Sequence, residues 1–318
     1  MASSKRKLVS ICIPVLNESE NVEPLYERLR VVATSLEVKY SFEFIFTDNH
    51  SSDNTWEKIR ILGIRDDRIK GLRFTSNVGF QESILANLAQ ASGLVMIQID
   101  ADLQDPPEMI NEFLSEWENG FKVVYGIRTS RGESSLSNSI RKLGYRVISK
   151  ISNHPIPIDV GDFRLIDKEV RDKLLQSKVP RPYSRGMIAS FGLQEKGIEY
   201  SRKERQANDS KFPIKSVFQL GLDGIFNHSS WPLRFSTFSG IFILVGSLGL
   251  SVYYLSLKIF SDALPQGLAS IHILVLFGIG MNALFLGVIG DYLNRIYVIL
   301  RNEPRYIVEE LINMAEKK

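Results

Sequence analysis

Two long stretches near the end of the chain carry no charged side chain, and they constrain the fold more than any other feature. The first is Phe235–Leu257, whose 23 residues would span roughly 35 Å as a helix, enough to cross a hydrocarbon core of about 30 Å. In the second, Ala263–Gly290, Pro265 and Gly267 predict that the helix begins near Leu268. Buried core helices are the alternative, but these are usually shorter and carry some polar residues. We therefore expect two transmembrane helices.

The charges beside these stretches predict their orientation. Arg234 precedes the first stretch, and three arginines follow the second: Arg295, Arg301 and Arg305. Because cytoplasmic segments are enriched in Lys and Arg, we expect both termini and the domain before the spans to face the cytoplasm. The N-terminal segment lacks the apolar run of a secretory signal, and the single Cys12, expected in the core, suits a reducing compartment. The chain is thus predicted to be an integral protein of the cytoplasmic (inner) membrane.

Residues 1–210 are expected to form one cytoplasmic α/β domain. From Leu8 to Ile127, β-rich runs alternate with amphipathic stretches, which is typical of a parallel sheet covered by helices. The β-rich runs are Leu8–Val15, Phe42–Thr47, Ile69–Phe74, Leu94–Ile99 and Lys122–Ile127. The helical stretches are Pro24–Leu36, Thr55–Ile64, Gln81–Ala91 and Pro107–Trp117. Ligands of such sheets bind beyond the carboxyl ends of the strands, so the polar residues there are candidate site residues.

The rest of the chain divides into smaller segments. A helix is predicted over Leu136–Ser152. In residues 211–232 apolar side chains recur at helical spacing, which favours an amphipathic helix in the membrane interface over one packed on the domain core. Residues 233–294 hold the two spans, and residues 295–318 are expected to form a cytoplasmic C-terminal helix.

The strongest local motif is IQIDADLQDPPE, over Ile97–Glu108. It places Asp100 and Asp102 at the mouth of a strand, where alternation points both carboxylates to the same side. Two such carboxylates repel each other unless a cation lies between them, and hard oxygen ligands suit Mg²⁺ or Mn²⁺ bridging to substrate phosphates. A solvated turn is the alternative reading of Asp-x-Asp alone.

Five motifs, taken in order, resemble the family 2 glycosyltransferases with a GT-A fold. They are VSICIPVLNESENV, FIFTDNHSSDNT, SNVGFQESI, IDADLQDPPE and VGDFRLID. Within that family the chain is similar to the polyprenyl-phosphate glycosyltransferases, a group that includes bactoprenol glucosyltransferase and dolichol-phosphate mannose synthase. The resemblance covers nearly the whole chain. It implies a Rossmann-like domain that binds a nucleotide-sugar, followed by the interfacial helix and the two spans.

The resemblance also implies roles for individual residues. The base and ribose of the nucleotide would be surrounded by Pro14, Asn17, Glu18 and Asp48. Asp100 and the catalytic Asp102, with Gln104, would hold the metal on the diphosphate. The family's usual Asp-Asp-Gly-Ser reads Asp48-Asn49-His50-Ser51 here, so His50 would occupy a position that favours positive φ. A surface turn residue is favoured over a functional role for His50.

On the acceptor side, the resemblance implies that Arg128, Arg202 and Arg205 bind the lipid phosphate, which suits the paired hydrogen bonds of a guanidinium. A general attraction of these arginines to the anionic leaflet is the alternative.

Asp162, in Gly-Asp-Phe-Arg, matches the catalytic base proposed in relatives. A phosphate monoester is mostly a dianion at pH 7, so Asp162 could instead orient a substrate or pair with Arg164.

The expected reaction is the inverting transfer of a sugar to a polyprenyl phosphate, with UDP-glucose as the donor that the resemblance favours. Two alternatives are a catalytically silent nucleotide-binding scaffold and a processive polysaccharide synthase. The Gln-x-x-Arg-Trp motif that such synthases carry is absent from this sequence.

The net charge of +3 is too small to suggest a nucleic-acid partner. Ala283 and Gly287 form a small-xxx-small pattern, which favours a homo-oligomer or close packing of the two spans.

Overall fold

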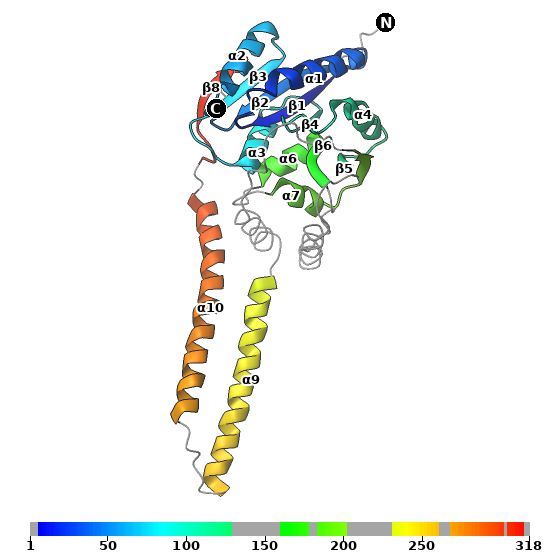
Figure 1. Cartoon of the computed structure of the whole chain (residues 1–318). Helices are drawn as coiled ribbons and strands as arrows, with labels where there is room; N and C mark the ends of the chain where they lie inside the picture. Colours follow the sequence, from blue (N-terminus) through cyan, green and yellow to red (C-terminus); the bar gives the residue numbers. More distant parts are fainter. Residues whose placement is uncertain are drawn as a thin grey trace. The chain divides into compact units, whose positions relative to one another are not determined.

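A computed structural model of the protein describes residues 6–128, 160–177, 183–201, 231–260, 268–301 and 304–314 (Figure 1). These residues belong to two compact units: one covers residues 1–217 and 303–318, and the other covers residues 218–302. The helix predicted over Leu136–Ser152 lies outside the described residues, as do residues 211–230 of the predicted interfacial helix.

The first unit is built on a mixed sheet whose eight described strands lie in the order β7-β5-β6-β4-β1-β2-β3-β8. The strands are β1 Lys7–Val15, β2 Tyr40–Asp48, β3 Ile69–Phe74, β4 Val95–Gln98, β5 Val123–Arg128, β6 Val160–Asp167, β7 Glu195–Tyr200 and β8 Val308–Ile312. All five strands expected from the β-rich runs are present. The central pairs β4-β1, β1-β2 and β2-β3 are parallel, as predicted.

The five predicted runs all point in the same direction, as expected, but the sheet that contains them is not purely parallel. β6 lies between β4 and β5 and is antiparallel to both. Every residue of β6 is buried, with Phe163 and Leu165 in one core cluster and Ile166 in the other. A strand that is buried on both faces is typical of the interior of a sheet, which agrees with its position between two neighbours.

Helices cover both faces of this sheet, and the predicted helical stretches are confirmed. On one face lie α1 (Val22–Leu36), α2 (Thr55–Arg65), the 3₁₀ turn η1 (Pro107–Met109) and α4 (Ile110–Glu118). On the other lie α3 (Phe80–Gln90), α6 (Lys168–Gln176) and α7 (Ser184–Ser190). Alternation along β1 sends Ile11 to the first face and Cys12 to the second, so Cys12 is a core residue, as predicted.

The C-terminal helix expected over residues 295–318 is wrong in its second half. Helix α10 ends at Arg301, and Val308–Ile312 forms the antiparallel edge strand β8 beside β3. Pro304 disfavours continuation of the helix, and Leu311 then packs with Leu72 and Phe74 of β3. The chain that follows the apolar helices therefore returns to the sheet, which Figure 1 shows as the red strand.

The second unit contains two long helices that contact each other: α9 (Trp231–Phe260) and α10 (Leu268–Arg301). They contain the two predicted spans. Large apolar side chains are exposed on both, such as Phe242 on α9 and Leu286 on α10. Among the described residues, one segment, Phe277–Arg301, is long and apolar enough to cross a membrane, with a mean hydropathy of 1.5. The second span remains a prediction.

Removal of the Phe163 ring should destabilise the domain. Phe163 is fully buried, and its ring centroid lies 4.7 Å from that of Phe113 and 6.0 Å from that of Tyr200. Phe163→Ala should cost about 3–5 kcal/mol, because the site cannot fully collapse. At about 2–4 °C per kcal/mol, the thermal unfolding midpoint should fall by on the order of 10 °C. The exposed control Ile64→Ala should leave it nearly unchanged, and equal midpoints would contradict this packing.

Candidate active site

The candidate site lies at the edge of the sheet where the parallel strands β1, β2 and β4 end. Val15 pairs with Asp48, and Cys12 pairs with Gln98, so the three carboxyl ends are neighbours. The antiparallel β6 begins at the same edge, which brings Asp162 close to the residues that follow β4. This edge corresponds to the switch point at which open α/β sheets bind ligands.

Four carboxylates gather after β4 and at the start of β6: Asp100, Asp102, Asp105 and Asp162. Burial, and then the charges of Asp162, Asp105 and Asp102, raise the pKa of Asp100 to about 8. The Oδ1 atom of Asp100 is buried without a hydrogen-bond partner among the described residues. Such a group is unfavourable when ionised unless a cation approaches it, so the donor set fits a divalent metal.

The expected metal ligands are near one another but do not form a closed cage. Asp102 Oδ1 accepts a hydrogen bond from the backbone N–H of Gln104 at 3.1 Å, and the Gln104 side chain is buried. The part of the chain that the structure describes contains no group of three or more His, Cys, Asp and Glu residues arranged to hold a metal ion. Mg²⁺ and Mn²⁺ sites that use one or two carboxylates are completed by waters and substrate phosphates.

Arg128, the last residue of β5, lies beside Asp105 of the carboxylate cluster. Its Nη2 is 3.9 Å from Asp105 Oδ2, and its Nε donates to the Tyr200 hydroxyl, which in turn donates to Asp105 Oδ1 at 2.5 Å. The guanidinium lies so close to Gly161 that a Cβ there would be 2.3 Å from Nη2. A side chain at position 161 would therefore displace the Arg128 guanidinium, which carries positive charge into the carboxylate cluster.

Asp162 lies between two arginines. Its Oδ1 is 3.3 Å from Arg185 Nε and 3.8 Å from Arg164 Nη2. Arg164 is buried and donates to the Gly161 carbonyl at 2.7 Å, while Arg185 donates to the Val160 carbonyl at 3.0 Å. The predicted pairing of Asp162 with Arg164 is therefore present, and a second cation accompanies it.

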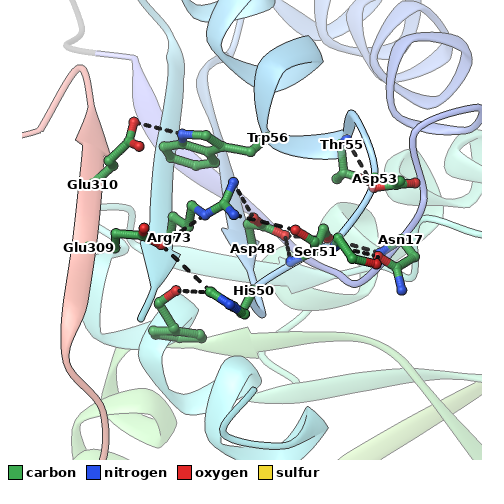
Figure 2. A network of polar contacts seen from close by, with 12 residues as sticks. Asn17, Asp48, His50, Ser51, Asp53, Thr55, Trp56, Arg73, Glu309 and Glu310 are labelled. Carbon is green, nitrogen blue, oxygen red and sulfur yellow. Dashed lines mark hydrogen bonds and ion pairs between the residues drawn. The ribbon is translucent and has the colours of Figure 1, made fainter. Parts of the chain in front are cut away.

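The expected nucleotide residues meet at the ends of β1 and β2. The buried Ser51 connects two of them, because its hydroxyl donates to Asp48 Oδ1 and accepts from the Asn17 backbone N–H (Figure 2). Asp48 is fully buried, and burial raises its pKa, opposed by hydrogen bonds from Ser51 and the charge of Arg73. Pro14 lies one residue before the end of β1, beside Thr47. Pro14, Asn17 and Asp48 therefore share one region.

Glu18 and His50 both make contacts within the domain. Glu18 Oε2 accepts from Asn21 Nδ2 at 2.6 Å, at the start of α1. His50 has φ of 62°, the left-handed conformation expected at a position where the family usually has glycine. Its Nδ1 lies 3.1 Å from the Phe74 carbonyl oxygen and 3.7 Å from Glu309, so the side chain interacts with β3 and β8.

Several residues of this edge were not predicted from the sequence. Arg185 and Tyr200 come from segments outside the five motifs. Arg73 lies just before the third motif, whereas Glu309 lies near the C-terminus. Asp105 lies within IDADLQDPPE, so its place in that motif was the available signal. The predicted Arg202 and Arg205 lie outside the described residues.

Comparison with known proteins supports the family assignment. Residues 10–175 match glycosyl transferase family 2. The glycosyltransferase YkcC of Bacillus subtilis is 36% identical, over 97% of this chain and 95% of its own length. The glycosyltransferase sll0501 of Synechocystis is 34% identical, over 95% of both chains. The prophage-derived bactoprenol glucosyl transferase of Shigella flexneri is 32% identical, over 95% of this chain and 97% of its own length.

The matched residues 10–175 contain the ends of β1, β2 and β4 and the start of β6, where the carboxylates gather. The relatives extend the similarity over both described units. The mixed α/β sheet is the GT-A type of fold that the resemblance implied. The chain belongs to glycosyl transferase family 2.

Proposed function

We propose that the protein transfers a sugar from a nucleotide-sugar to a polyprenyl phosphate. The observation that carries this proposal is the cluster of Asp100, Asp102, Asp105 and Asp162, which lies at the same edge of a family 2 domain as the buried Asp48. A relative that matches both units of the chain is named as a bactoprenol glucosyl transferase, which supports a lipid phosphate as the acceptor and glucose as the sugar. UDP-glucose is our first choice of donor.

Asp100 and Asp102, with Gln104, would hold Mg²⁺ or Mn²⁺. When bound, the metal would neutralise charge on the donor diphosphate, which makes the nucleoside diphosphate a better leaving group. Pro14, Asn17, Glu18 and Asp48 would surround the base and ribose. The ends of β1 and β2, which carry these residues, lie next to the end of β4, which carries the proposed metal ligands. This arrangement supports the assignment, because the base and the diphosphate of one nucleotide bind at the same edge of the sheet.

Arg128, Arg202 and Arg205 would bind the acceptor phosphate. An acceptor dianion needs little deprotonation at pH 7, so we assign Asp162 to orienting substrate rather than to strong base catalysis. Its two arginine partners fix the position of the carboxylate. A single displacement by the acceptor oxygen at the anomeric carbon would break the bond to the diphosphate oxygen and invert the configuration.

Both α9 and α10 would span the cytoplasmic membrane, with the catalytic unit and both termini on the cytoplasmic side. Their exposed apolar side chains support this placement, because such surfaces are favourable in lipid. Insertion would keep the site where an insoluble acceptor is found. The small-xxx-small pair Ala283 and Gly287 on α10 would support association of copies of the chain.

Membranes that contain the protein should transfer radiolabel from a nucleotide-sugar, UDP-glucose first, into a lipid that extracts into organic solvent. The assay screens several nucleotide-sugars with a supplied polyprenyl phosphate. Label in a long polymer would instead indicate a processive synthase. Nucleotide binding without any transfer would indicate the silent scaffold, and either result would overturn the proposal.

The transfer activity should depend on a divalent cation. Chelation should abolish it, and Mg²⁺ or Mn²⁺ should restore it. Asp102→Asn should lower turnover by about a hundredfold or more, since it removes a charge that would hold the metal. The matched control is Asp172→Asn, an aspartate on α6 that pairs with Arg171 and should be nearly neutral. Full activity of Asp102→Asn in saturating chelator would exclude the metal assignment.

Arg202→Ala and Arg205→Ala should each impair use of the acceptor. Loss of a charge-assisted contact costs on the order of 1.5–3 kcal/mol, which raises the apparent KM for acceptor about tenfold to a hundredfold. Donor affinity should hardly change. The measurement uses a short-chain polyprenyl phosphate in detergent, where leaflet charge is absent. Lys215→Ala, which removes a basic residue of the predicted interfacial helix, serves as the control. Equal, small changes in the acceptor KM from all three substitutions would show that these side chains only interact with the membrane surface.

A further inference from the structure

The C-terminal strand β8 reaches the nucleotide end of the candidate site. Across three neighbouring strands, Asp48 of β2 pairs in register with Arg73 of β3, and Arg73 pairs with Glu310 of β8. The register then shifts, because Phe74 pairs with Val308. Glu309 is therefore an extra residue on β8, and such irregularities redirect side chains.

Because of this shift, the consecutive residues Glu309 and Glu310 both contact side chains of the domain, one on β3 and one on α2. Glu309 Oε2 is 3.0 Å from Arg73 Nε, and Glu310 Oε2 accepts from Trp56 Nε1 at 2.8 Å (Figure 2). In a regular strand, neighbouring side chains point to opposite faces. The two contacts differ in kind, since Glu310 ties β8 to α2, whereas Glu309 engages a cation beside Asp48.

Arg73 connects β8 with Asp48. Its Nη1 lies 3.7 Å from Asp48 Oδ2, and its Nη2 donates to the Ser51 carbonyl at 3.4 Å. Among the described residues it is the only cation within ion-pair distance of Asp48. Asp48 Oδ2 has no hydrogen bond from the residues that the structure describes, so Arg73 is the partner on that side of the carboxylate, while Ser51 donates to Oδ1.

We infer that Glu309 and Arg73 are positioning residues for the nucleotide base, with Glu309 of the C-terminal strand holding Arg73 beside Asp48. The inference rests on the proposed function, in which Asp48 contacts the base. Without Glu309, the guanidinium loses its shortest contact and is free to leave Asp48 or to close on it. Either movement changes the carboxylate that meets the base and leaves the diphosphate end of the site untouched.

The test is calorimetric titration of the full-length protein in detergent with Mg²⁺ present. The probes are UDP and GDP, which carry a base, and inorganic pyrophosphate, which does not. Glu309→Gln should weaken binding of the preferred nucleotide about threefold to tenfold, and Arg73→Gln should weaken it at least as much. Arg73→Lys, which keeps the charge, should recover part of the loss. Pyrophosphate affinity should stay unchanged in all three variants.

Glu310→Gln is the matched control, because it removes the charge of the neighbouring glutamate on the same strand, whose carboxylate accepts from Trp56. It should leave nucleotide affinity unchanged, and thermal unfolding verifies that each variant is folded. Equal losses in Glu309→Gln and Glu310→Gln, or no loss in Glu309→Gln, would overturn the inference. A wild-type protein that binds pyrophosphate but neither nucleotide would instead overturn the proposed function.

Discussion

Repulsion among the carboxylates at one edge of the sheet is the constraint on which the rest of the structure depends. Asp100 is buried beside Asp162, Asp105 and Asp102, and its pKa is raised accordingly. The fold opposes this repulsion with cations drawn from three separate elements: Arg128, Arg164 and Arg185. These arginines form ion pairs with Asp105 and Asp162. Asp100 and Asp102 are therefore the two carboxylates that we expect to bind a divalent cation.

The backbone explains how so many charges can meet. Parallel strands bring the loops after β1, β2 and β4 to one edge, and the antiparallel β6 begins there, so Asp162 faces the residues after β4. Gly161 leaves space for the Arg128 guanidinium, which any side chain would displace. At the far side of the same edge, β8 brings Glu309 to Arg73 and Asp48. The site is therefore assembled from both ends of the chain.

The parts predicted from the sequence are those that local patterns decide. The runs that became β1 to β5 and the helices that cover them follow from apolar periodicity, and Asp100 and Asp102 follow from their place after a strand. The position of β6 and the pairing of β8 depend on contacts between distant segments. The sequence VEELI after Pro304 fits a helix or a strand equally, and its contacts with Leu72 and Phe74 decide the outcome. Arg185 and Tyr200 gave no local signal for the same reason.

The central claim, that Asp100 and Asp102 hold a cation together with the donor diphosphate, is tested most directly by electron paramagnetic resonance of Mn²⁺ with the full-length protein. Wild-type protein with UDP should convert the free-ion signal to a bound one, and Asp100→Asn and Asp102→Asn should each greatly reduce the bound fraction. An equal bound fraction in wild type and both variants would contradict the account, because the ion would then be held elsewhere.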